Sequence, residues 1–180
     1  MEVLEKKYTY SDYEKLGEGA PYQLIGGNLV MNPAPVPTHQ RISRNIEYYL
    51  FAFVQEHNLG EVFYSPIDVL LGTQEVYQPD ILFIAKNRLS IIGEKNIQGA
   101  PDLVIEILSE SSVYNDLKKK KKVYESGGVQ EYWIVDPNDQ TIEIYVLKGG
   151  KYVLEKEFVK TETLQSPLLL GFSLKLDKVF

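Results

Sequence analysis

The chain has 180 residues, of which 44% are hydrophobic and 24% are charged, as expected of a soluble globular protein that can bury a core. Its 19 Lys and Arg against 25 Asp and Glu give a net charge of −6, which argues against coating nucleic acid through overall attraction but leaves room for a local basic surface. The lack of cysteine excludes disulfides and thiolate metal sites, and the sequence shows neither a membrane span nor a secretory signal. We therefore predict one cytoplasmic domain, residues 1–180, with no membrane segment.

The first third of the chain predicts a short helix, a hairpin and a long helix. Ser11 is a candidate cap for the short helix, and "YQLIGGNLVMN" predicts two strands around Gly26–Gly27. The connector "NPAPVP" suits neither a helix nor a central strand. Thr38 is a candidate cap for an amphipathic helix over residues 39–58, with Gly60 as its stop signal. The apolar residues of that helix recur at helical spacing, namely Ile42, Ile46, Tyr49, Leu50 and Phe53.

The remainder predicts strands separated by a single helix. Three strand-like runs come first: "EVFYSPIDVLL", "VYQPDILFIA" and "DLVIEIL". A helix over 113–126, the short strand "QEYWIVD" and an antiparallel hairpin over 141–159 follow, and "SPLLLGFSLKL" predicts a last edge strand. This order predicts a mixed α/β (α+β) fold, in which a central mixed sheet is flanked by helices and extended by antiparallel hairpins.

Glu106 is the most informative residue, because it lies in a run that is apolar on both faces. Such a run predicts a central strand that is covered on both sides. Leu103, Ile105 and Ile107 point to one face of this strand and Glu106 to the other. An unpaired buried carboxylate is costly and is tolerated only beside a cation, a basic side chain or a metal. A structural ion pair or a strand end near solvent would explain Glu106, but we favour a functional carboxylate.

Asp80 is the second candidate carboxylate. It follows Pro79 at the start of another apolar strand, which places it at the rim of a sheet. Alone it is as easily explained as a turn residue, but on a strand beside Glu106 the two carboxylates could share one divalent ion. Asp68, in "SPIDVLL", is a weaker third candidate on an adjacent strand. We interpret Asp102 as structural, because at about 3.3 Å per residue it lies about 13 Å from Glu106 on the same strand.

Five consecutive lysines, residues 118–122, lie in the second helix. At about 100° per residue, phasing from Val113 places Leu117 and Tyr124 on the apolar stripe and Lys120 within it. The other lysines fall at the edge of the stripe or outside it: Lys118, Lys119, Lys121 and Lys122. These four are expected to be solvated or to contact phosphates.

Lys120 is therefore predicted to face the sheet. Asp116 precedes it by one helical turn and is one candidate partner. Glu106, a short loop upstream, is the other anion within the predicted core. The alternative is that Lys120 extends along its aliphatic stem towards solvent.

Two carboxylates on adjacent strands with a nearby lysine resemble the metal site of the PD-(D/E)XK nuclease superfamily. The sequence more specifically resembles the Uma family of restriction-endonuclease-like proteins. The matching segments span nearly the whole chain in order: "YQLIGGNLVMNPAPVPTHQRI", "VYQPDILFI", "GAPDLVIEILSESS", "DLKKKKKVYESGGVQEYWIVDP" and "SPLLLGF". The resemblance implies a restriction-endonuclease-like core, Mg²⁺ or Mn²⁺ as cofactor, DNA as partner, and pairing of two chains into a homodimer.

The resemblance also implies roles for individual residues. It makes Asp80 the aspartate of "PD" and Glu106 the acidic residue of "(D/E)XK", whereas the usual strand lysine is replaced by Leu108. Members of the family supply the lysine from the next helix in a D-x₃-K-x₃-Y pattern, here Asp116, Lys120 and Tyr124. His39 matches a common histidine of the family and is either an accessory residue of the metal site or an exposed residue at a helix start.

The implied chemistry is metal-dependent hydrolysis of phosphodiester bonds. Asp80, Glu106 and the backbone carbonyl of Ile107 would hold the ion, and Lys120 would orient water or stabilise charge at phosphorus. The motifs of serine hydrolases, P-loop enzymes and zinc proteases do not occur in the sequence. Two alternatives stay open: a catalytically silent nuclease-fold module with a binding or regulatory role, and a purely structural cluster of charges.

Overall fold

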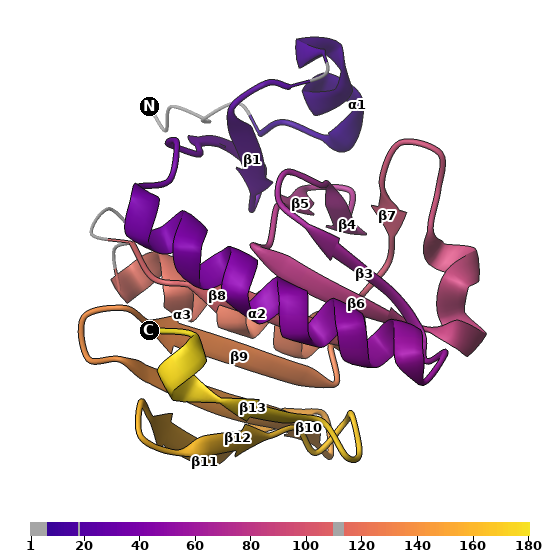
Figure 1. Ribbon diagram of the computed structural model, residues 1–180. Helices are drawn as coiled ribbons and strands as arrows, with labels where there is room; N and C mark the ends of the chain where they lie inside the picture. The colour runs from indigo at the N-terminus through magenta and orange to yellow at the C-terminus, as the bar shows by residue number, and fades with distance from the viewer. Residues whose placement is uncertain (1–6, 18, 110–113) are drawn as a thin grey trace.

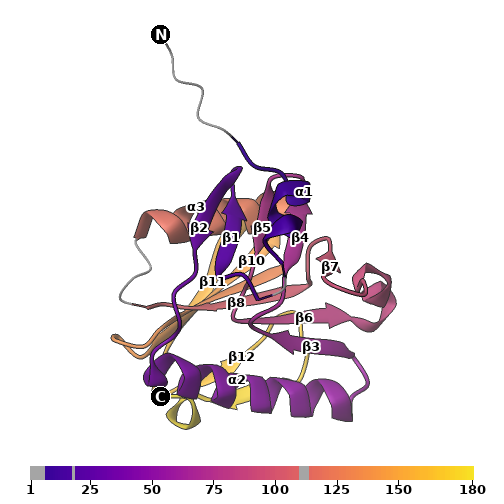
Figure 2. The same cartoon turned by 90° about the horizontal axis from the view of Figure 1, so that it is seen from above.

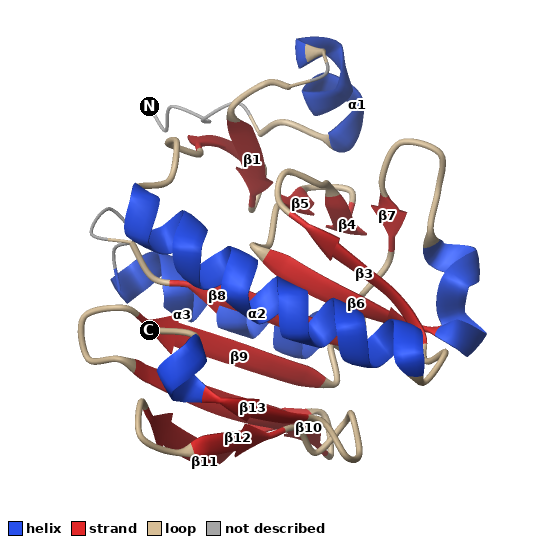
Figure 3. Ribbon diagram, in the orientation of Figure 1, coloured by secondary structure: helices blue, strands red, loops and turns tan. Residues whose placement is uncertain are grey.

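The computed structural model describes residues 7–17, 19–109 and 114–180, and for residues 114–117 it describes the backbone alone. At its centre lies a mixed sheet of six strands in the order β11–β10–β9–β8–β6–β3 (Figures 1 and 3). The strands are β3 (Gly60–Tyr64), β6 (Ile81–Ala85), β8 (Leu103–Ile107), β9 (Glu131–Asp136), β10 (Thr141–Lys148) and β11 (Lys151–Val159). Within this sheet, β8 and β9 pair in parallel and the other described neighbours are antiparallel. The observed architecture is thus the mixed α/β fold that the sequence predicts.

Two helices cover opposite faces of this sheet. Figure 2 shows α2 (Pro37–Glu56) on one side and α3 (Tyr114–Gly127) on the other. The alternation of β8 explains the arrangement, since Ile105 packs in the core beneath α2 whereas Val104 packs with Tyr124 of α3. Helix α2 buries residues at four-residue intervals, Ile42, Ile46, Leu50 and Val54. The two-sided burial predicted for the Glu106 strand is confirmed.

A second sheet of five strands, in the order β2–β1–β5–β4–β7, corrects the strand prediction. It contains β1 (Tyr22–Ile25), β2 (Asn28–Met31), β4 (Val69–Gly72), β5 (Glu75–Tyr77) and β7 (Ile97–Gln98). The run "EVFYSPIDVLL" divides into β3 and β4, and "VYQPDILFIA" divides into β5 and β6, so that each run contributes to both sheets. Each division falls at a proline, Pro66 or Pro79, because proline has no N–H with which to continue a ladder.

The predicted caps of both N-terminal helices were each wrong by two residues. Helix α1 (Tyr10–Tyr13) is capped at Thr9 rather than Ser11, and the Asp12 carboxylate accepts the Thr9 N–H at 3.1 Å. A 3₁₀ turn, η1 (Glu14–Leu16), continues it. Helix α2 is capped at Val36 rather than Thr38, because Pro37 takes the first helical position, where a missing N–H costs nothing.

The chain ends in a small unit of its own. Among the described strands, β12 (Thr163–Gln165) and β13 (Ser173–Lys175) pair only with each other, so the predicted tail strand does not extend the central sheet. The 3₁₀ turn η3 (Leu176–Lys178) follows, and a second such turn, η2 (Lys86–Ile91), follows β6. The terminal unit contributes apolar side chains to the core on the α2 face of the sheet: Leu164, Leu169, Phe172, Leu174, Leu176 and Val179.

A buried carboxylate holds this terminal unit against the sheet. Glu131, the first residue of β9, is 1% exposed. It accepts hydrogen bonds from Trp133 Nε1 at 2.6 Å, Ser166 Oγ at 2.8 Å and the Leu168 N–H at 2.8 Å. Burial raises the pKa of Glu131, and these three donors oppose the rise. In the part of the chain that the structure describes, no helix is both long enough and apolar enough to cross a membrane.

Candidate active site

The pairing of β6 with β8 brings the two candidate carboxylates together. The strands are antiparallel with Ile81 opposite Ile105, so the next position in the register places Asp80 opposite Glu106. Asp80 immediately precedes β6, and its side chain is 17% exposed. Glu106 is the fourth residue of β8 and is 5% exposed. A rim carboxylate and a buried one thus lie side by side on neighbouring strands.

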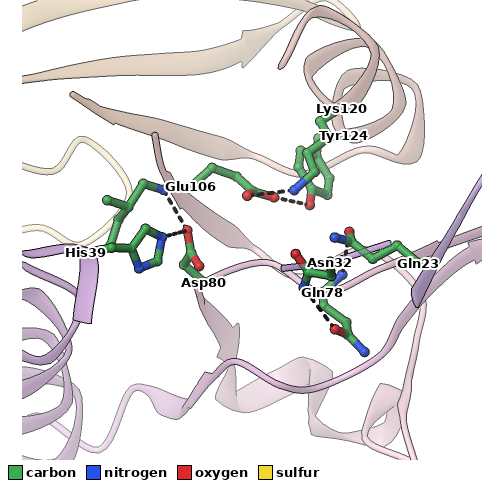
Figure 4. Close-up of polar contacts among 9 residues, drawn as sticks. Gln23, Asn32, His39, Gln78, Asp80, Glu106, Lys120 and Tyr124 are labelled. Carbon is green, nitrogen blue, oxygen red and sulfur yellow. Dashed lines mark hydrogen bonds and ion pairs between the residues drawn. The ribbon is translucent and has the colours of Figure 1, made fainter. Parts of the chain in front are cut away.

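Helix α3 supplies the cation that Glu106 needs. Lys120 Nζ lies 2.9 Å from Glu106 Oε2, and the Tyr124 hydroxyl donates to Glu106 Oε1 at 2.6 Å (Figure 4). The two side chains are four residues apart and therefore share one face of the helix. Lys120 is buried as predicted, whereas Lys118, Lys119 and Lys122 are exposed and Lys121 is intermediate. Of the residues that phased the helix, Val113 lies outside the described residues and the side chain of Leu117 is not described.

The electrostatics of Glu106 follow from its burial. Loss of solvent raises the pKa of the Glu106 carboxyl, the Lys120 ammonium opposes this, and the nearby Asp80 carboxylate adds to the rise. Burial, followed by the charge of Glu106, raises the pKa of Tyr124 well above its ordinary value, so its hydroxyl stays a donor. A buried carboxylate beside a second carboxylate is a place where additional positive charge is favourable.

The Asp80 carboxylate has different partners. His39, in the first turn of α2, places Nε2 at 3.2 Å from Asp80 Oδ2, and the Ile107 N–H donates to the same oxygen at 2.7 Å. Burial by itself lowers the pKa of His39, but the hydrogen bond and charge of Asp80 outweigh it, so that the net pKa is raised. His39 is 8% exposed, and its Nδ1 is buried without a hydrogen-bond partner among the described residues. The exposed histidine considered from the sequence is therefore excluded.

The remaining candidates lie elsewhere or are not described. Asp68 precedes β4 in the other sheet and accepts hydrogen bonds from Tyr13 and Gln78, so its placement on a strand beside Glu106 was wrong. The side chain of Asp116 is not described. Asp102 is structural as predicted, since it pairs with Arg88 at 2.8 Å and accepts the Ala85 N–H.

The donor atoms fit a hard divalent cation. Mg²⁺ is commonly bound by one or two carboxylates, with water completing its shell. Asp80 Oδ1 accepts no hydrogen bond from any described residue, and Asp80 and Glu106 occupy opposing positions on their strands. Among the side chains that the structure describes, in residues 7–17, 19–109 and 118–180, no group of three from His, Asp or Glu is arranged to hold a metal. An ion here would thus be held by two carboxylates, with the remaining ligands from water, substrate or backbone oxygen.

Sequence reasoning missed a group of amides beside Asp80. Gln78, two residues before Asp80, contacts Gln23 of β1 and Asn32, which follows β2 (Figure 4). Gln23 is buried although it is polar. No periodicity marks such residues, and the only available signal was the position of Gln78 directly before the Pro79–Asp80 pair.

Comparisons with known proteins identify the family and the fold. A family model described as "Putative restriction endonuclease", Uma2, matches residues 9–177. A solved structure from Anabaena variabilis, titled a putative nuclease belonging to DUF820, superposes with a TM-score of 0.80 at 22% identity, covering 96% of this chain and 97% of that one. A comparison with curated proteins yields no match. At this identity the solved structure establishes the nuclease-like fold, and the family match over most of the chain establishes that the protein belongs to the Uma2 family of restriction-endonuclease-like proteins.

Proposed function

We propose that this protein is a metal-dependent endonuclease that hydrolyses phosphodiester bonds of DNA at the site formed by Asp80, Glu106 and Lys120. One observation supports this most strongly: the Lys120 ammonium of α3 contacts Glu106 of β8, directly beside the opposing Asp80. Family membership and the nuclease-like fold support the same activity.

In the proposed mechanism, Asp80 and Glu106 would hold Mg²⁺ or Mn²⁺, and the Ile107 carbonyl would add a ligand. The ion, when bound, would lower the pKa of a bound water and polarise the phosphate. Within the chain, the Ile107 N–H and His39 keep the Asp80 carboxylate oriented through Oδ2. Lys120 would turn from Glu106 to the substrate, where its ammonium orients the attacking water or stabilises the charge that develops at phosphorus.

The proposal extends to the assembly that acts on DNA. One site cleaves one strand, so cutting a duplex calls for two copies, and we propose a homodimer in the cytoplasm. Lys119 and Lys122 are exposed on α3, the helix that also carries Lys120. They would contact the phosphates next to the scissile phosphate.

A catalytically silent module is the alternative, and one observation favours it. Both carboxylate oxygens of Glu106 already have donors within the protein, Lys120 and Tyr124. A site permanently closed in this way would keep the fold without the catalysis.

Incubation of supercoiled plasmid with the purified protein distinguishes the endonuclease from the catalytically silent module. The proposal predicts nicking or linearisation that requires Mg²⁺ or Mn²⁺, disappears with chelator, and is lost in Glu106→Gln. Gln130→Ala, a change at an exposed residue next to β9, is the matched control and should cut like the wild type. Absence of cleavage by the wild type with any divalent ion would favour the silent module.

A further inference from the structure

Asp80 lies at a place where the chain crosses twice between the two sheets. The segment between β3 and β4, residues 65–68, makes one crossing, and the segment between β5 and β6, residues 78–80, makes the other. The Ser65 N–H donates to the Asp80 backbone carbonyl at 2.9 Å, so the two crossings run side by side. The backbone position of Asp80 therefore depends on how these two segments are held together.

Gln78 joins three separate parts of the chain at this point. Its backbone N–H donates to Gln23 Oε1 at 3.1 Å, and its side-chain Oε1 accepts from Asn32 Nδ2 at 3.2 Å. Its Nε2 donates to Asp68 Oδ1 at 2.9 Å. Only Pro79, whose φ is fixed by its ring, separates Gln78 from Asp80, so a shift of Gln78 passes directly to Asp80.

Asp68 is the anchor of this group. Its Oδ1 accepts hydrogen bonds from both Gln78 Nε2 and the Tyr13 hydroxyl, the latter at 3.0 Å. Burial, together with the charge of Asp68, raises the pKa of Tyr13, so the hydroxyl remains a donor. Because one Asp68 oxygen accepts both hydrogen bonds, it fixes the second crossing against the first.

We propose that Gln78 and Asp68 are positioning residues that set the place of the Asp80 carboxylate, and that they thereby couple the N-terminal hairpin to the site. The inference rests on the proposed function only in making Asp80 a metal ligand. The positional effect itself is a property of the protein without metal. It also accounts for Asp68, a carboxylate that lies near the site without belonging to the pair of Asp80 and Glu106.

The Ile107 amide reports on the position of Asp80, because its N–H donates to Asp80 Oδ2. Hydrogen exchange of this amide, measured by NMR on the metal-free protein, tests the proposal. Gln78→Ala and Asp68→Ala should speed exchange at Ile107 by about fivefold, the loss expected of one net hydrogen bond. The neighbouring Leu108 amide donates to the Val135 carbonyl instead and should be unchanged.

Two conservative variants distinguish a change in the position of Asp80 from a general weakening of the strand that carries Ile107. Gln78→Glu keeps an acceptor for Asn32 but loses the donor to Asp68, so it should behave like Gln78→Ala. Asp68→Asn keeps an acceptor for both Tyr13 and Gln78 and should restore slow exchange. Equal acceleration of exchange at Ile107 and Leu108 would mean that the variants weaken the whole strand. Unchanged exchange at Ile107 would mean that Asp80 is held in place without Gln78. Either result overturns the proposal.

Mn²⁺ affinity, measured by calorimetry, connects the position of Asp80 to the proposed function. Residues that support a metal ligand typically change affinity by about 10–100-fold, so the neutral change Gln78→Ala should weaken Mn²⁺ binding by that factor, whereas Asp68→Asn should not. Equal binding by Gln78→Ala and the wild type would count against the inference alone. A wild type that neither binds Mn²⁺ nor cleaves DNA would refute the proposed function, while the exchange measurement would still decide the role of Gln78.

Discussion

Lys120 Nζ and Glu106 Oε2 lie 2.9 Å apart in the core between α3 and the central sheet, and both side chains are almost fully buried. A charge pair in this environment loses the hydration of both ions, and its attraction is offset by that loss. We therefore expect the pair to contribute little net stability, and the proposed function gives it a chemical role beside Asp80. The same geometry makes the consequences of breaking the pair measurable.

Removing one partner should destabilise the protein strongly. Lys120→Met leaves Glu106 buried without its cation, which typically costs about 3–5 kcal/mol in the free energy of unfolding. The double variant Glu106→Leu with Lys120→Met removes both charges and should recover most of that loss. Urea unfolding of the wild type, Lys120→Met and the double variant measures these differences in the free energy of unfolding. A double variant as unstable as Lys120→Met would show that the pair itself stabilises the fold.

Tyr124→Phe isolates the second donor to Glu106. The change removes one hydroxyl at constant ring volume and leaves Glu106 Oε1 without a partner, so it should cost about 1–3 kcal/mol. Thermal unfolding measures the loss. Tyr145→Phe is the control, since its hydroxyl donates to Glu143 at a partly buried position away from Glu106. Equal effects of the two changes would argue against a special role for the Tyr124–Glu106 contact.

The exposed lysines of α3 should contribute to DNA affinity without specifying sequence. Each phosphate contact contributes about 0.9 to the slope of log affinity against log salt, so Lys119→Gln with Lys122→Gln should reduce the slope by about 2. Fluorescence anisotropy over a salt series measures it. Lys175→Gln with Lys178→Gln removes two exposed lysines from the C-terminal unit and should leave the slope unchanged. An equal reduction of the slope in both double variants would indicate that DNA is attracted without a defined binding surface.

Glu131 gives the protein a defined pH dependence. Its folded pKa is raised above the ordinary 4.5, so the native state holds this proton more tightly than the unfolded state does. The resulting stabilisation is present below about pH 4.5 and is lost as pH rises through the folded pKa. The free energy of unfolding of the wild type should therefore fall relative to that of Glu131→Gln as pH rises from about 4.5 through the folded pKa of Glu131. Guanidinium unfolding at each pH checks this, and a constant difference would contradict the raised pKa.

Local periodicity in the sequence was sufficient to predict side-chain directions where one apolar face determines how an element packs. The phase of α3 predicted that Lys120 points inward while its neighbours do not, because a helix fixes the direction of each side chain relative to its apolar stripe. The alternation of β8 predicted the opposite faces of Ile105 and Glu106 in the same way. Both predictions needed only the geometry of one element.

Pairing between distant segments could not be predicted in this way. Strand propensity does not tell which sheet a strand joins, so β3 and β4 appeared as one run, and so did β5 and β6. For the same reason Asp68 was placed beside Glu106, although it lies with Tyr13 and Gln78. The contact of His39 with Asp80 likewise depends on where the first turn of α2 meets the sheet.

The central claim is that Asp80 and Glu106 bind one divalent ion that Lys120 serves in catalysis. Its most direct test is the anomalous scattering of a crystal soaked in Mn²⁺. The proposal predicts a peak between the Asp80 and Glu106 carboxylates, with the Lys120 ammonium within hydrogen-bond reach of the ion's water or of a bound phosphate. A crystal with no peak at this position, and with Lys120 still paired to Glu106 at saturating Mn²⁺, would contradict it.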